Sequence, residues 1–213
     1  MDHVAITTTD IEKDSKELER LGFKHRFTEY GLKNAKEKAP LLRHWADRHD
    51  ISVFDGIEGI ALELTMHHRK ADYLYNKGFV PVSDDGSIVG VVRAVDSIEK
   101  SRTFYAALGL RPEDKNGFLH LHVDSPVEKL KSRIIVGKTT DPRDSEPMYL
   151  DDAGFPCVAF ISTDLEADAK KLHGEETQYI TDDFKFKVNN KKMKICFVIG
   201  PSGEIIELIE MVR

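Results

Sequence analysis

Thr9-Asp10-Ile11-Glu12, Asp96-Ser97-Ile98-Glu99 and Thr163-Asp164-Leu165-Glu166 share one pattern that decides how this chain folds. Each stretch begins with a side-chain oxygen that can cap a helix, and each has glutamate three residues later. Such a capping box predicts the first turn of a helix. One match could arise by chance, but three that follow apolar runs of similar length predict a repeated structural unit.

The residues on either side of these capping boxes extend the repeated unit. An apolar run rich in valine and isoleucine precedes each box and predicts a strand, at Val4–Thr8, Ile88–Val95 and Cys157–Ser162. A glycine follows each predicted helix, at Gly22, Gly109 and Gly174. Because glycine readily takes the left-handed conformation that ends a helix, these positions predict the three helix ends.

Further runs of strand-forming residues follow each helix. The predicted strands are Lys24–Tyr30, Ile51–Phe54, Ile60–Met66, Phe118–Val123, Arg133–Val136, Thr177–Ile180, Phe184–Val188, Met193–Ile199 and Ile205–Met211. The pair Asn189-Asn190 predicts a tight hairpin turn, because asparagine tolerates positive φ. Each unit therefore has the approximate order βαβββ. The predicted fold class is α+β, with repeated modules that form curled mixed sheets.

The modules divide the chain into two expected domains. Residues 1–80 form the first βαβββ module, with an insertion at about residues 33–50 in which Trp45 is expected to fill the core. Residues 86–213 hold two further modules, which we expect to form one domain, and the polar stretch Pro81–Gly86 marks the boundary. The first module then lacks a partner within the chain. A homodimer that pairs two first modules across a twofold axis is the resulting hypothesis.

Composition excludes several classes of function. The 213 residues include 31 Lys and Arg against 37 Asp and Glu, a net charge of -6 that argues against binding to nucleic-acid phosphates. No run approaches the roughly 18 apolar residues of a membrane helix, and the first residues do not resemble a secretory signal. Cys157 and Cys196 lack CxxC spacing and are expected to be reduced thiols. We therefore expect a cytoplasmic protein.

Several motifs resemble those of the vicinal oxygen chelate superfamily of glyoxalases, bleomycin-resistance proteins and extradiol dioxygenases. They are the opening Asp2–Ile6, the run Ser101–Leu110 that contains Phe104-Tyr105 and Leu108-Gly109-Leu110, and the closing Gly200–Leu208. In the last run Gly200 stands where the family has aspartate. The resemblance implies paired βαβββ modules that curl around a cavity, with a divalent metal held by residues of the first and last strands of each paired module.

The register of the capping boxes tests these implied metal ligands one by one. The family's first-strand ligand position corresponds to His3, Gly90 and Cys157, and a Gly-x-x-x-Glu-Leu pattern nominates Glu63 and Glu207 on last strands. The second module offers only Ile134 or Ile135, so it lacks ligands. Strand alternation supports the nominations independently, because it places His3 opposite Val4 and Ile6, and Glu63 opposite Leu62 and Leu64.

These residues allow more than one function. His3, Glu63 and Glu207 would suit zinc, nickel, iron, manganese or cobalt, with Glu207 or Glu63 as ligand or proton-transferring base, in a lyase, isomerase or dioxygenase acting on a small organic molecule. Cys157 and the strand pair His120 and His122 are further candidates for a ligand cavity. The alternatives are a metal-free small-molecule binding protein of the bleomycin-resistance type and a non-catalytic interaction module.

Overall fold

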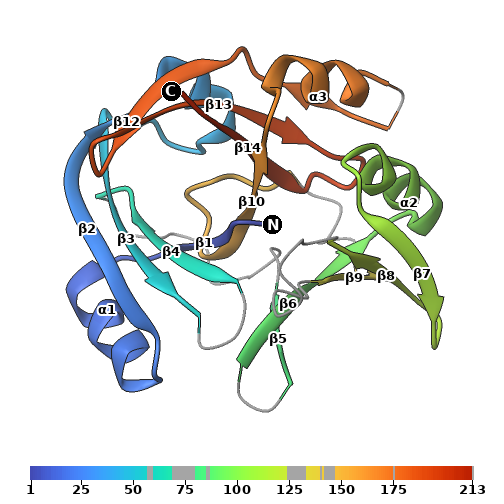
Figure 1. Ribbon diagram of the computed structural model, residues 1–213, viewed down its shortest axis with the longest axis horizontal. Helices are drawn as coiled ribbons and strands as arrows, with labels where there is room; N and C mark the ends of the chain where they lie inside the picture. The colour runs from blue at the N-terminus through green and yellow to red at the C-terminus, as the bar shows by residue number, and fades with distance from the viewer. Residues whose placement is uncertain are drawn as a thin grey trace.

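The structure is a computed structural model that describes residues 1–56, 60–68, 80–84, 87–123, 133–139, 141, 147–174 and 176–212. Figure 1 shows curled sheets with the helices on their outer sides. The repeated strand and helix order confirms the predicted α+β class with βαβββ modules. No helix of the described residues is both long and apolar enough to cross a membrane.

Each module contributes one helix and a set of strands. Module one consists of β1 (His3–Thr7), α1 (Ile11–Arg20), β2 (Lys24–Lys33), the 3-10 helix η1 (Lys36–Leu41), β3 (Arg48–Asp55) and β4 (Ala61–Met66). After β5 (Val80–Asp84), module two consists of β6 (Ser87–Val95), α2 (Ile98–Ala107), β7 (Arg111–Lys115), β8 (Phe118–His122) and β9 (Arg133–Lys138). Module three consists of β10 (Gly154–Ser162), α3 (Leu165–Leu172), β11 (Tyr179–Ile180), β12 (Phe184–Val188), β13 (Lys191–Ile199) and β14 (Ile205–Met211).

Strand pairing joins module one to module three. In the described part of the chain, a nine-stranded sheet has the order β11-β13-β14-β10-β1-β4-β3-β2, with β12 paired to β13. The junction is the antiparallel pair β1 and β10. Module two and β5 form a separate five-stranded sheet of order β5-β6-β9-β8-β7.

This pairing differs from the expectation that modules two and three would pair and leave module one for a second copy of the chain. β10 bonds to β1 on one side and to β14 on the other, so no edge of β10 remains for module two. Module one already has its partner within the chain. The stated reason for a homodimer therefore no longer holds.

The helix caps lie one residue later than predicted. The N-cap side chains are Asp10, Ser97 and Asp164, which accept hydrogen bonds from the backbone N–H groups of Lys13, Lys100 and Ala167. In modules one and three the cap's own N–H donates to a hydroxyl two residues earlier, on Thr8 or Ser162, instead of to the predicted glutamate. Because the shift is the same in all three helices, the register between modules is unchanged.

Turn residues bear out most of the predicted chain reversals. Asn189 and Asn190 have φ of 47° and 61°, which confirms the predicted β12–β13 hairpin. Gly22 and Gly109 take positive φ after α1 and α2. The prediction was wrong for the third helix, which ends with an extended His173 rather than with a left-handed Gly174.

The nine-stranded sheet buries both of its faces. The outer face packs under the helices through alternate strand residues such as Val4, Leu62, Val158 and Leu208. The inner face carries Ala5, Ile51, Cys157, Ile195 and Ile209, which form a second apolar cluster. This alternation is the one predicted for the first and last strands, and it turns His3, Glu63 and Glu207 toward the inside.

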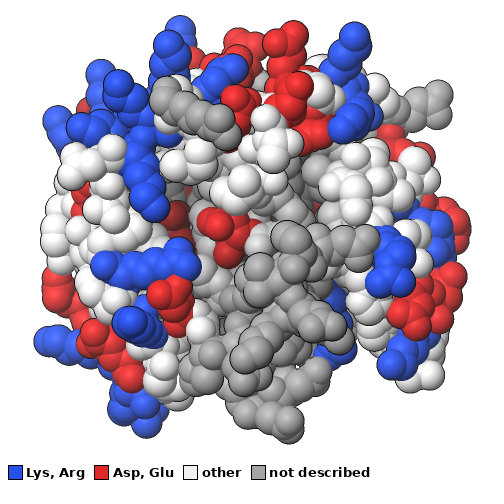
Figure 2. All heavy atoms as spheres, in the orientation of Figure 1, with Lys and Arg blue, Asp and Glu red and all other residues white. Residues whose placement is uncertain are grey.

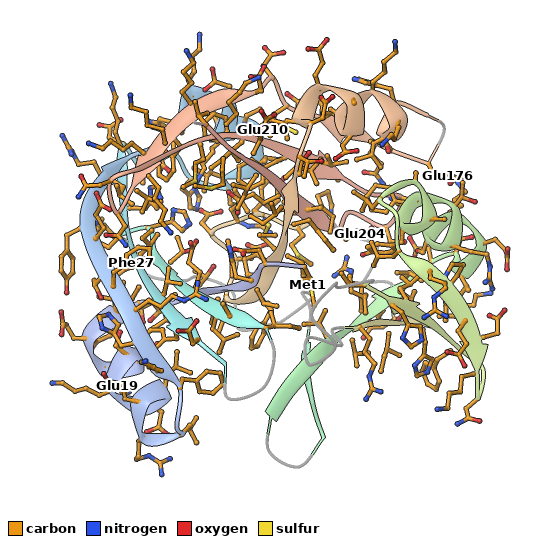
Figure 3. The ribbon with its side chains drawn as sticks, viewed as in Figure 1. Met1, Glu19, Phe27, Glu176, Glu204 and Glu210 are labelled. Carbon is orange, nitrogen blue, oxygen red and sulfur yellow. The ribbon has the colours of Figure 1, made fainter. Side chains whose placement is uncertain are left out.

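Module two contacts module three through a buried polar cluster at the β13–β14 turn. The Arg93 guanidinium donates to the Ser202 carbonyl at 2.9 Å, and the Ser202 N–H donates to Glu204 at 2.7 Å. Figure 3 labels Glu204 where this turn approaches α2. Burial raises the pKa of Glu204, although the charge of Arg93 opposes the rise.

The Asp164 cap provides a test of the α3 boundary. We expect Asp164→Ala to lower the free energy of unfolding by about 1 kcal/mol, because the Ala167 N–H loses its acceptor. Asp164→Asn keeps an acceptor at the same position and should restore most of the stability. Urea unfolding followed by circular dichroism measures both; equal stability of the alanine and asparagine variants would contradict the assigned cap.

Candidate functional site

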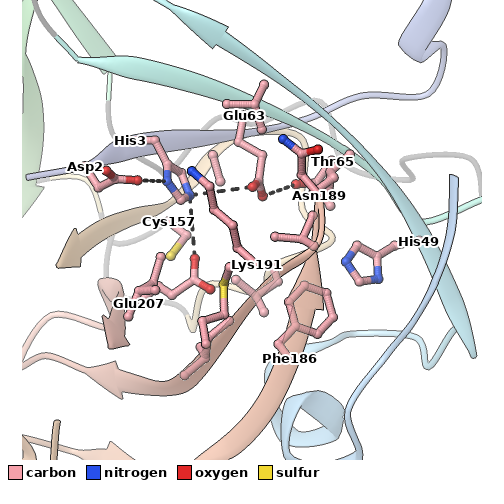
Figure 4. A pocket seen from close by; sticks show the side chains of 18 of the residues that line it. Asp2, His3, His49, Glu63, Thr65, Cys157, Phe186, Asn189, Lys191 and Glu207 are labelled. Atoms are coloured by element: carbon pink, nitrogen blue, oxygen red, sulfur yellow. Dashed lines mark hydrogen bonds and ion pairs between the residues drawn. The ribbon is translucent and has the colours of Figure 1, made fainter. Parts of the chain in front are cut away.

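The inner face of the nine-stranded sheet encloses a cavity of about 200 Å³. Strands of modules one and three line it, together with η1, as the close view in Figure 4 shows. Most of its walls are apolar, from residues such as Phe27, Ile51, Val53, Ile195 and Phe197. Polar groups gather at two places on this wall, one around His3 and one around Lys38.

His3 lies between two carboxylates that come from different modules. Its Nε2 atom is 3.8 Å from Glu63 Oε2 and 3.7 Å from Glu207 Oε2. Its Nδ1 atom donates to Asp2 Oδ2 at 2.9 Å. Among the described residues, His3 Nε2 is one of the buried side-chain atoms that have no hydrogen-bond partner. The imidazole is thus oriented by Asp2 and directed toward the two glutamates.

Strand register explains why these residues meet. Ala5 on β1 is level with Glu63 on β4, and Ala159 on β10 is level with Glu207 on β14. His3 is itself level with Ala159 across the β1–β10 junction. Because Ala5 and Ala159 have small side chains, they leave room above the sheet for the imidazole and both carboxylates. Thr65 Oγ1 donates to Glu63 Oε1 at 3.1 Å and holds that carboxylate.

The electrostatics of this group favour a positive charge between the two glutamates. Burial lowers the pKa of His3, but the carboxylates of Glu63, Asp2 and Glu207 outweigh burial and hold the pKa well above its usual value. Burial raises the pKa of Glu63, and the charge of His3 opposes that rise. The pKa of Asp2 is lowered: burial would raise it, but the hydrogen bond to His3 and the nearby charges prevail.

The other predicted site residues are placed differently. Cys157 lines the same cavity, and burial raises the pKa of its thiol well above the usual value. His120 and His122 lie on β8 of the other sheet and do not line the cavity; His122 Nε2 is 2.8 Å from Glu113 Oε2. Gly90 could not carry a ligand side chain, since a Cβ there would meet the Arg133 carbonyl at 2.3 Å.

A second polar group on the cavity wall was not predicted as a site. It consists of Lys38 on η1, His49 on β3 and His67 just after β4. The His49 ring stacks against those of His67 and Phe186, with centroids 5.9 and 6.0 Å apart. Burial lowers the pKa of His49 to about 2 and that of His67 to about 4, with the charge of Lys38 contributing to both shifts.

His67 and Trp45 differ in exposure. His67 is 4% exposed, because it follows β4 into the cavity wall. Trp45 was expected in the core but is 46% exposed, and its indole N–H donates to Asp47. Inside the insertion, Leu41 and Leu42 provide the buried apolar contacts instead.

The His3 group fits a divalent metal in the kind of atoms it offers. An imidazole nitrogen and two carboxylates are a common set of three protein ligands, and Asp2 supplies the outer hydrogen bond that metal-bound histidines usually make. Donor atoms in a tetrahedral zinc shell lie roughly 3.4 Å apart, so the 3.7 and 3.8 Å separations are a few tenths of an ångström wide. Across the described residues, no group of three or more His, Cys, Asp or Glu side chains forms a ready-made metal site.

The two buried histidines predict a loss of stability in acid. The folded-state pKa values of His49 and His67 lie below the usual 6.5. Below about pH 6.5 the unfolded chain therefore binds more protons than the folded chain, and acid favours unfolding. Their contribution is complete above about pH 6.5 and is lost as the pH falls toward about 4 for His67, and lower for His49. We expect His49→Gln to flatten the dependence of unfolding free energy on pH in this range, and exposed His173→Gln to leave it unchanged. Equal slopes for the two variants would contradict the buried neutral state.

Thiol chemistry provides an independent test of the cavity wall. Both cysteines are free and buried. Burial raises the pKa of Cys196 to about 12 and raises the pKa of Cys157 well above its usual value. Because thiolates react and thiols do not, we expect neither cysteine to react quickly with a thiol reagent in the folded protein near neutral pH. Both should react after denaturation. Fast labelling of Cys157 in the folded state would show that its thiol is ionised.

Comparisons with known proteins find likenesses of structure. No protein-family model matches the sequence, and a comparison with curated proteins finds no match. Similar solved structures include glyoxalase I from Zea mays, with 15% identity and a TM-score of 0.42 over 98% of this chain and 66% of that chain. They also include a putative dioxygenase from Bacillus subtilis, with 12% identity and a TM-score of 0.41 over 98% of this chain and 60% of that one. This chain thus spans less than two thirds of either protein.

A shorter similar structure is a virulence protein from Salmonella typhimurium, with 18% identity and a TM-score of 0.41 over 62% of this chain and 99% of that one. Likenesses of this size do not indicate which reaction or ligand this chain serves. Its own elements show paired βαβββ modules, with first strands side by side and a shared inner cavity. That is the fold implied by the resemblance to the vicinal oxygen chelate superfamily.

Proposed function

We propose that the cavity is the site of a divalent-metal-dependent enzyme of the lyase, isomerase or dioxygenase type, acting on a small organic molecule. One observation carries the proposal: the buried Nε2 atom of His3 has no hydrogen-bond partner and faces two carboxylates from opposite modules. A buried histidine between two glutamates favours a positive charge at their midpoint. A divalent cation would supply that charge in place of a proton.

Each residue of the group has a distinct task in this proposal. His3, Glu63 and Glu207 would hold the ion, and Asp2 would keep the His3 Nδ1–H in place so that Nε2 is free to ligate. A bound ion would polarise an oxygen of the organic molecule as a Lewis acid. Its three protein ligands leave positions open for that molecule.

Glu63 is also suited to move a proton. Burial raises its pKa, which favours the uptake of a proton by this carboxylate. The Thr65 hydroxyl holds one oxygen, and the other points to the His3 side of the cavity. The apolar walls around the carboxylate would exclude water from the transfer.

Metal analysis of the purified protein tests the proposal directly. After dialysis against zinc, nickel, iron, manganese or cobalt, we expect about one ion per chain in the wild type, as three protein ligands hold one catalytic ion. His3→Ala and Glu207→Gln should lose the ion, since each removes one of those ligands. His120→Ala removes a histidine from the other sheet and should keep it. Asp2→Asn should weaken affinity by about 10- to 100-fold, as loss of an outer-shell partner does.

A metal-free binding protein is the second candidate function. In module three the first-strand ligand position is occupied by Cys157, whose thiol has a raised pKa, and the described residues hold no ready-made metal group. If the wild type takes up no ion, or if His3→Ala takes up as much as the wild type, the cavity serves for binding and the metal proposal is wrong.

A further inference from the structure

We propose that the cavity binds a small organic anion, with an apolar body of about the size of one ring and a carboxylate that pairs with Lys38. The inference rests on the proposed function only in placing the substrate in the same cavity. It adds a chemical class for that substrate and a second recognition point, distinct from the His3 group.

Lys38 is a buried cation on the cavity wall. The residue is 8% exposed, and its Nζ atom lies 5.4 Å from the ring centroids of both Phe186 and Phe197. Within the described part of the chain, no hydrogen bond or ion pair to Lys38 Nζ is formed. The two ring faces attract the ammonium, but they accept no full hydrogen bond. A buried ammonium in this state favours an anion beside it.

The side chains around Lys38 do not provide that anion. His49 and His67 are neutral at physiological pH, because burial lowers the pKa of each to about 2 and about 4. The Nδ1 atoms of both rings are buried without a hydrogen-bond partner among the described residues. A hydroxyl group on the same molecule can pair with either atom, because a hydroxyl both donates and accepts hydrogen bonds.

The carboxylates at the other end of the cavity are already engaged. Glu63 accepts from Thr65, and Glu63 and Glu207 both face His3. A cation held there would balance them further. The charge of Lys38 acts to lower the pKa of Glu63, but no ion pair joins these two described residues, so a substrate carboxylate can pair directly with the ammonium.

The shape and rim of the cavity agree with a small anion. Its volume of about 200 Å³ is below the ~300–1,000 Å³ of pockets for drug-sized ligands. Arg26 and Lys191 line the cavity in addition to Lys38. Figure 2 shows basic side chains gathered over β12 and β13, where Lys185, Lys187 and Lys192 are exposed beside Lys191. Of these basic residues, Arg26 and Lys191 line the cavity, and their positive charges would attract an anion toward it.

Benzoate and its neutral isostere benzamide are suitable probes, since they differ in charge and hardly in shape. We expect benzoate to bind the wild type at least about tenfold more tightly than benzamide does, as an ion pair with a buried ammonium requires. Lys38→Met should remove that difference. Lys36→Met is the matched control, because Lys36 is exposed on the same short helix and should bind benzoate like the wild type. Titration calorimetry near neutral pH measures both probes with each of the three proteins.

Two results would overturn the inference. One is equal affinity of the wild type for benzoate and benzamide, including the absence of benzoate binding. The other is benzoate binding by Lys38→Met at wild-type strength. Lys38→Gln, which stays polar without the charge, replaces the methionine variant if circular dichroism shows that the latter is unfolded.

The anion proposal and the metal proposal can be tested separately. The benzoate titration is repeated with chelator-treated protein and with His3→Ala. Binding of benzoate that still depends on Lys38 in both samples supports the anion site even if no metal is ever found. If the wild type binds a metal but does not bind benzoate, the metal proposal stands and the anion proposal is wrong.

Discussion

The antiparallel pairing of β1 with β10 is the contact on which the rest of this structure depends. It sets two first strands side by side, with His3 opposite Ala159 and Ala5 opposite Cys157. Each first strand then bonds in parallel to the last strand of its own module, β4 or β14. These registers bring Glu63 and Glu207 to the same inner surface as His3, although 144 sequence positions separate the two glutamates. Loss of this ladder would separate the two halves of the cavity.

The cavity keeps two kinds of polar group apart on one apolar wall. One end holds three acidic side chains around a single imidazole, and the other holds one ammonium beside two neutral imidazoles. Buried charges of this kind stabilise a protein poorly by themselves, because desolvation offsets much of their attraction. Their retention in a wall that is otherwise apolar is better explained by what the cavity binds.

Local patterns in the sequence predicted much of this fold, because they act over a few residues. Alternation in the first and last strands placed His3 and Glu63 on the inner face, and the paired asparagines after Val188 predicted the hairpin turn. The capping boxes located all three helices but missed the cap by one residue, because the residue before each cap, Thr9, Asp96 or Thr163, is also a good capping residue. Strand β7 was missed since it is charged and contains Pro112, although the turn Asn116-Gly117 after it is a strong hairpin signal.

Contacts between residues far apart in the sequence could not be predicted from local sequence patterns. A repeat shows that modules are alike but not which two will pair, so the partner of module one was assigned wrongly. The Lys38 group was missed for a related reason. Lys38 lies in an insertion without strand or helix periodicity, and only packing of η1 against β12 and β13 turns it inward. The role of Asp2 had only a weak sequence signal, which is that its carboxylate is adjacent in sequence to the candidate ligand His3.

The β1–β10–β14 arrangement also has a consequence for the order of events during synthesis. β1, which carries His3, leaves the ribosome before β14, which carries the second carboxylate partner, Glu207. Until then β10 lacks its β14 neighbour and has an open edge, and the incomplete pocket faces water. Maturation of the pocket must therefore follow translation of β14, and a chain that stalls before that strand would carry an unfinished pocket and a strand edge prone to aggregation.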